Sequence, residues 1–188
     1  MTAPPAMANQ EWEPVTTGKL IGFAIGAALF ALLVFASQSG FVFLIDHANL
    51  LFHEAGHPII GLFSGRLEPY GGTVGQLAFP IILAVNFWRK GQPLSFAGAL
   101  LWFFENWLNI ACYMADARAQ ALPLAGGGDH DCNTIFNRWH LLAYDMRIAK
   151  VVRTMGWIGM VGGCGWVVWR WFRDRNRPGS KGDSSLDH

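Results

Sequence analysis

Two histidines and a glutamate near residue 55 have the spacing of a zinc site. His53, Glu54 and His57 form the pattern HExxH. Residues four apart project from the same face of a helix, so the two imidazoles can bind one metal ion. Glu54 lies about 100° away around that helix, where it can take a proton from a metal-bound water. The motif therefore predicts metal-assisted hydrolysis, because zinc lowers the pKa of bound water to about 7.

The motif supplies only two ligands, whereas a catalytic zinc usually has three and keeps its fourth position for water. A helix over residues 94–114 would align Glu105, Asn109 and Asp116 in one stripe. Asp46, Leu50, His53 and His57 form a matching stripe on the motif helix. Polar side chains are costly in a membrane and turn inward, so the two stripes are expected to face each other.

Asp116 is the first choice for the third zinc ligand, because it lies at the end of the second stripe. His130 and Asp131 are the alternatives, since the glycine-rich loop before them could fold back over the site. Asn109 is expected to donate a hydrogen bond to the oxyanion that forms when water attacks a carbonyl.

Long stretches with almost no charge predict an integral membrane protein. The 188-residue chain is 52% hydrophobic and contains nine Trp and 14 Phe. Five apolar segments are candidates for membrane-spanning helices; they are residues 19–37, 41–63, 76–88, 94–114 and 151–172. We therefore expect an all-α, polytopic helical bundle with about five spans.

The chain divides into one membrane domain, residues 19–172, and two polar ends. Residues 1–18 are expected to form a flexible arm, and residues 173–188 a disordered basic tail. The glycine-rich residues 64–75 predict a short re-entrant or hairpin segment after the motif helix. Asn133 or Thr134 could begin an amphipathic helix that ends near Lys150.

The distribution of basic residues predicts the orientation in the membrane. Arg89, Lys90 and the basic tail would lie on one side of a five-span chain, and the acidic N-terminal segment on the other. The positive-inside rule then places the C-terminus in the cytoplasm. The bilayer is the expected partner of the apolar surface, and no nucleic-acid partner is expected.

The order of these features resembles the site-2-protease-like family of intramembrane zinc metalloproteases. Residues 52–57, followed by Gly61 and Gly65, resemble the family's motif helix, and residues 70–80 resemble its glycine-rich segment and second helix. Asp116 stands where the family has its aspartate ligand. The resemblance covers residues 41–118. It implies a zinc endopeptidase that cleaves a membrane-protein or peptide substrate in a bacterial cytoplasmic membrane.

Two other functions agree with the same residues. The first is a non-catalytic membrane scaffold or partner subunit that retains a metal or polar site. The second is a transporter or ion path lined by Asp46, Glu105 and Asp116.

Overall fold

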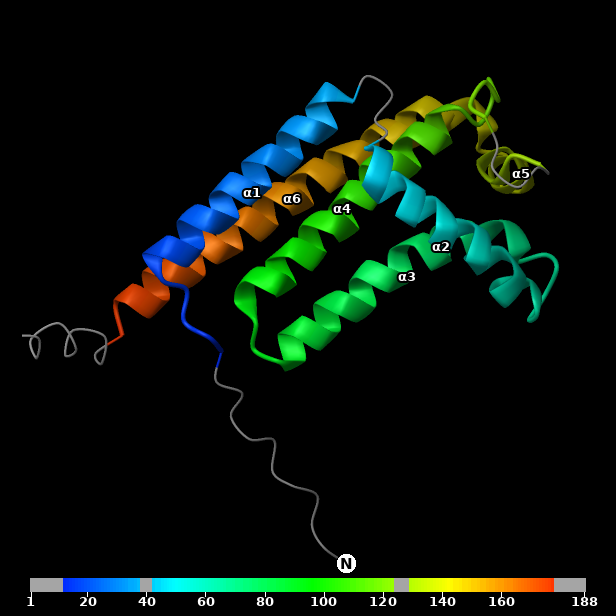
Figure 1. Ribbon diagram of the computed structural model, residues 1–188. Helices are drawn as coiled ribbons and strands as arrows, with labels where there is room; N and C mark the ends of the chain where they lie inside the picture. The colour runs from blue at the N-terminus through cyan, green and yellow to red at the C-terminus, as the bar shows by residue number, and fades with distance from the viewer. Residues whose placement is uncertain (1–11, 38–41, 124–128, 178–188) are drawn as a thin grey trace, which may run out of the picture.

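The computed structural model describes residues 12–37, 42–123 and 129–177, and within these ranges it contains helices and no strand. The expected all-α fold is therefore confirmed. Figure 1 shows the elements in order; they are α1 (Thr17–Ala36), α2 (Phe43–Gly61), α3 (Glu68–Arg89), α4 (Pro93–Ala115), α5 (Asp131–Arg138), the 3₁₀ turn η1 (Leu142–Tyr144) and α6 (Asp145–Arg175).

Three helical segments in the described part of the chain are long and apolar enough to cross a membrane. They are Thr17–Ala36, Glu68–Arg89 and Leu142–Arg175, the last of which includes η1. The other two expected spans, residues 41–63 and 94–114, fold as α2 and α4. These two helices carry most of the buried polar side chains of the candidate site, which lowers their hydropathy.

Helix α4 lies at the centre of the bundle. It packs against α6 on one side and against α3 on the other, while α1 lies along α6 (Figure 1). A Cβ added to Gly156 would lie 2.7 Å from the Leu108 side chain, and one added to Gly159 would lie 2.1 Å from Phe104. The glycines of α6 therefore allow close packing against α4, as small residues do where membrane helices meet.

Helices α2 and α3 form an antiparallel hairpin whose backbones approach closely. The prediction of a short re-entrant or hairpin segment over residues 64–75 is wrong from residue 68 onward, because residues 68–75 belong to α3. A Cβ on Gly56 would lie 2.0 Å from the Gly71 carbonyl oxygen, and one on Gly75 would lie 2.3 Å from the Phe52 carbonyl oxygen. The glycines therefore serve helix packing rather than turns.

The N-terminal residues that precede α1 pack against the end of α6. Val15 is buried, and its N–H donates to Asp174 Oδ2 at 3.0 Å. Trp12 lies edge-on to Trp166, with ring centroids 5.5 Å apart. Residues 12–16 are thus packed rather than part of the expected flexible arm. Residues 17 and 18 of the expected arm belong to α1, and residues 173–175 of the expected disordered tail belong to α6. Residues 1–11 and 178–188 lie outside the described residues.

The expected helix from residue 134 to about residue 150 is interrupted. Helix α5 ends at Arg138, and His140 has a φ of 55°, a left-handed conformation that helices do not contain. The cap of α5 is His130 rather than Asn133, because His130 Nδ1 accepts from the Asn133 N–H at 3.3 Å. The expected triple-glycine loop, residues 126–128, lies outside the described residues.

Candidate metal centre

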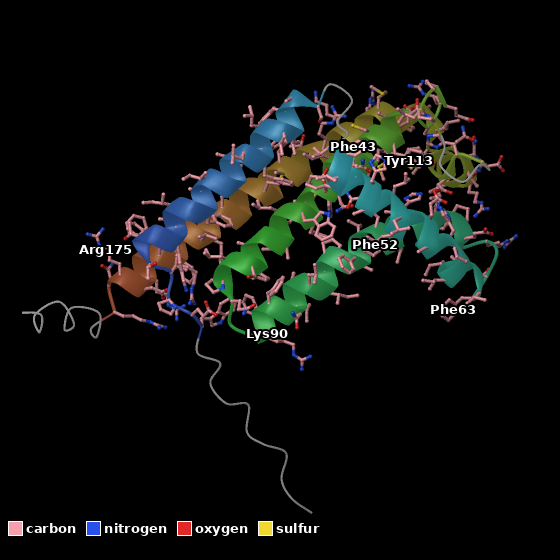
Figure 2. The ribbon with its side chains drawn as sticks, viewed as in Figure 1. Phe43, Phe52, Phe63, Lys90, Tyr113 and Arg175 are labelled. Atoms are coloured by element: carbon pink, nitrogen blue, oxygen red, sulfur yellow. The ribbon has the colours of Figure 1, made fainter. Side chains whose placement is uncertain are left out.

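Two imidazoles of α2 and one carboxylate of α5 converge on a single point. Asp131 Oδ2 lies 3.0 Å from His53 Nε2 and 3.2 Å from His57 Nε2. All three atoms lie within 4.8 Å of one another. In Figure 2 this region lies near the labelled Phe52 and Tyr113, and the Tyr113 ring centroid is 5.9 Å from that of His53.

The spacing of the three donor atoms fits a tetrahedral zinc site. Zinc binds imidazole nitrogen and carboxylate oxygen at about 2.0–2.2 Å, so two tetrahedral ligands lie about 3.3 Å apart. The two separations between imidazole nitrogen and Asp131 oxygen, 3.0 and 3.2 Å, are close to that value. Three protein donors also leave a fourth position for water, as in catalytic zinc sites.

Each imidazole has an oxygen partner on its other nitrogen. His53 Nδ1 lies 3.3 Å from Gln76 Oε1, and His57 Nδ1 lies 2.9 Å from the Glu68 carbonyl oxygen. Both oxygens accept hydrogen bonds, which places the ring proton on Nδ1 and the lone pair on Nε2. Two lone pairs then face the Asp131 carboxylate, an arrangement that a bound cation stabilises.

Gln76 links a metal-site histidine to Asn109. Its side chain is 3% exposed, and its Nε2 donates to Asn109 Oδ1 at 3.0 Å. With its oxygen engaged in this way, Asn109 has its Nδ2 hydrogens left for donation, and the residue lines the cavity at the site. Asn109 therefore lies in the cavity with a free donor, and its role as the oxyanion donor stays a prediction.

The candidate ligands line a cavity of about 870 Å³, within the usual size range of ligand sites. Glu54 and Asn109 line the same cavity, together with His53, His57 and Asp131. Its walls include the apolar side chains of Leu50 and Ile110. The structure thus brings the expected general base, the expected oxyanion donor and the three metal-site residues into one space.

The structure places Asp131, not Asp116, beside the two imidazoles. Helix α4 ends at Ala115, and the Asp116 carboxylate accepts from the N–H groups of Ala121 and Leu122, each at 3.0 Å. The geometry therefore does not support Asp116, the first choice for the third ligand, and favours the alternative Asp131. Asp116 instead stabilises the turn that follows α4, because its two oxygens satisfy backbone donors there.

His130 does not reach the two imidazoles either. Its buried ring stacks on Tyr113 with centroids 4.0 Å apart, and its Nε2 lies 3.5 Å from Asp116 Oδ2. Burial lowers the pKa of His130 and so favours the neutral ring, although the nearby Asp116 acts in the opposite direction. His130 and Asp116 thus hold the segment that presents Asp131.

Helix α5 is attached to the tip of the α2–α3 hairpin. Trp139 Nε1 donates to the Tyr70 hydroxyl at 2.7 Å, and Arg138 donates to the Arg66 carbonyl. These contacts lie about two turns after Asp131 and set its position relative to α2. They could not be expected from local sequence patterns, since the partners are about 70 residues apart.

Gly72 determines where the His53 ring can lie. A Cβ at this position would be 2.3 Å from His53 Nε2, far inside van der Waals contact. The glycine is buried within α3, facing the motif helix. Gly72 was expected to serve a turn, and its role beside His53 follows from the packing of α3 on α2.

A buried polar network lies one helical turn before His53. Asn49 Nδ2 donates to Asp46 Oδ1 at 3.0 Å and to Glu105 Oε2 at 3.2 Å, and Trp102 Nε1 donates to Asn49 Oδ1 at 2.8 Å. Asp46, Asn49 and Glu105 are each 1% exposed. The expected contact between polar stripes of α2 and α4 is present, with Asn49 as the joining residue.

Comparisons of the chain with protein-family models, with curated proteins and with solved structures found no match. The resemblance to site-2 proteases therefore stays a prediction from the motif and the order of elements. Function has to be inferred from the residues of the site, since an all-helical fold alone does not determine it.

Proposed function

We propose that this protein is an intramembrane zinc metallopeptidase in which His53, His57 and Asp131 bind the metal. The proposal rests on the convergence of these three donors in a cavity that Glu54 also lines. Two imidazoles and one carboxylate are a ligand set that catalytic zinc sites use, and imidazole is a poor ligand for Mg²⁺ or Ca²⁺.

The side chains around the site have complementary roles in peptide hydrolysis. A zinc ion held by His53, His57 and Asp131 would lower the pKa of a bound water and would polarise the substrate carbonyl. Glu54 accepts the proton of the attacking water and passes it to the departing amine. Asn109 donates from Nδ2 to the oxyanion, and its orientation is fixed by the hydrogen bond from Gln76.

We further propose that α1, α3, α4 and α6 cross the membrane and that α2 lies in it without crossing, with residues 12–16 and the C-terminal end of α6 on the cytoplasmic side. Five crossings do not fit the structure, because the Glu13 N–H donates to the Gly91 carbonyl and the Val15 N–H donates to Asp174. The acidic N-terminal segment therefore lies beside the basic residues and not on the opposite side, as was expected.

Large apolar side chains are exposed on the outer face of α2, including Leu51 (68%) and Ile59 (57%), whereas its polar residues face α3 and α4. This distribution suits a helix in lipid. The substrate would be a membrane-embedded or juxtamembrane peptide segment, and the resemblance suggests a bacterial cytoplasmic membrane.

The proposal is tested by replacing the general base without removing a ligand. We expect the purified full chain to cleave a quenched-fluorescent casein in a zinc-dependent manner. Glu54→Gln should lower the rate about 100-fold or more, with zinc still bound. Glu68→Gln is a matched control, because Glu68 also lines the cavity but interacts with His57 only through its backbone.

Full activity of zinc-loaded Glu54→Gln would remove Glu54 from the mechanism. Zinc binding without cleavage by the wild type would favour the non-catalytic scaffold. Absence of zinc from the wild type would contradict the metal site itself.

A further inference from the structure

Basic side chains gather at the end of the molecule opposite α5. In Figure 2, Arg175 lies at the left and Lys90 at the lower edge of the molecule, whereas Phe63 lies at the right. Two backbone contacts join its parts: the Glu13 N–H donates to the Gly91 carbonyl at 2.9 Å, and the Val15 N–H donates to Asp174. We define the basic end by its exposed cations: Lys19, Arg89, Lys90, Arg173, Arg175 and Arg177.

The positive charge of the basic end is only partly neutralised by described residues. Glu13 pairs with Lys19 at 3.2 Å, and the buried Asp174 lies 3.7 Å from Arg170. The arginines in the last turn of α6 and beyond project into solvent. This end therefore presents an excess of cations that can attract anions.

Aromatic side chains lie directly beside these cations. The Arg173 guanidinium lies 5.5 Å from the centroid of the Trp169 ring, and that of Arg175 lies 5.4 Å from the Trp171 ring. Trp169 is 53% exposed. Tryptophan favours the boundary between lipid and water, where the ring contacts acyl chains and long cationic side chains reach the headgroups.

The three helical segments most suited to cross a membrane all have one end here. Segment Thr17–Ala36 begins at the basic end, and segments Glu68–Arg89 and Leu142–Arg175 finish there. The cations thus lie at or just beyond the ends of apolar helices. A phospholipid matches both features, because its phosphate can contact the cations and its acyl chains can contact the apolar surface beside them. Nucleic acid or an acidic protein would use the cations only.

The opposite end has a different charge pattern. Arg118 there is paired with Asp145 at 2.6 Å, and the carboxylates of Asp116 and Asp131 lie nearby. Arg147, Lys150 and Arg153 are exposed on the first turns of α6. These three residues of α6 provide a control that matches Arg173, Arg175 and Arg177 in number of charges.

We propose that the basic end binds the headgroups of anionic phospholipids. The guanidinium groups contact lipid phosphates, and the adjacent tryptophans contact the acyl chains below them. This interaction is independent of the metal site, and it fixes the helix ends at the anionic surface of the bilayer.

The test uses the full chain in phosphatidylcholine nanodiscs that contain a fraction of brominated phosphatidylglycerol. Bromine quenches nearby tryptophan, so the relative affinity for the anionic lipid can be measured. We expect the triple variant Arg173→Gln/Arg175→Gln/Arg177→Gln to lower this affinity about 100-fold. The triple variant Arg147→Gln/Lys150→Gln/Arg153→Gln should retain it.

Unchanged thermal unfolding of both triple variants in pure phosphatidylcholine would verify that they fold. Equal affinity of wild-type protein for the anionic and the zwitterionic lipid would overturn the proposal. An equal loss of affinity in both triple variants would also overturn it. If a low concentration of inorganic phosphate abolished the quenching, the basic end would be a site for free anions and the proposal would likewise fail.

Discussion

Replacing Gly72 by alanine tests whether the position of the His53 ring matters for metal binding. The added Cβ would lie 2.3 Å from Nε2 and 2.4 Å from Cε1 of His53, whereas ordinary contact begins at 3.4 Å. The ring must therefore retreat by about 1.1 Å, or turn away from Asp131. Metal–ligand distances tolerate only about 0.2 Å of error.

This displacement predicts a large loss of zinc affinity without a loss of helix stability. Disturbing the groups that orient a metal ligand typically lowers affinity 10- to 100-fold, and we expect about 100-fold for Gly72→Ala. Alanine also stabilises a helix interior by about 1 kcal/mol relative to glycine. The metal-free variant should thus unfold at a temperature close to that of the metal-free wild type.

The assay is a competition between the purified protein and a fluorescent zinc chelator, combined with thermal unfolding with and without zinc. Gly98→Ala is the matched control, because Gly98 lies on α4 with no atom within 4 Å of an added Cβ. Wild-type zinc affinity in Gly72→Ala would refute the inferred geometry of the site. An equal loss of affinity in Gly98→Ala would show that the effect is general.

Two further replacements test the buried polar contacts. Gln76→Leu should lower zinc affinity about tenfold because His53 Nδ1–H loses its acceptor, whereas Gln76→Glu retains an acceptor and should bind zinc nearly as the wild type does. Asn49→Ala removes the donor shared by two buried carboxyl groups, so the free energy of unfolding should fall by about 3 kcal/mol. Denaturant titration measures this loss. Replacing the exposed Asn137 by alanine is the control and should change the free energy of unfolding little. Equal stability of the two variants would contradict the network.

Segments without charge could be predicted well from the sequence. The expected spans 19–37 and 94–114 agree closely with α1 (Thr17–Ala36) and α4 (Pro93–Ala115). Their hydrophobic length leaves little choice but helix. The start of α3 was harder to predict, because glycines usually indicate turns. Only the contacts of these glycines with α2 show why a helix accommodates them.

The motif histidines could be found by their spacing, but the sequence did not decide which of Asp116, His130 and Asp131 lies beside them. Helical periodicity placed Asp116 on the inward stripe of α4, yet the helix ends just before it and its carboxylate caps the next turn. Which distant acid returns to the site depends on long-range contacts of α5. Asn49 carried a usable signal, because it lies four residues before His53 and therefore on the same helix face.

The most direct test of the metal site is the zinc content and zinc-edge X-ray absorption of the purified full chain. We predict one zinc per chain with two imidazole ligands and oxygen, and loss of most of that zinc in Asp131→Ala but not in Asp116→Ala. A wild-type protein without zinc, or an Asp131→Ala variant whose metal content and absorption spectrum match those of the wild type, would contradict the proposed site.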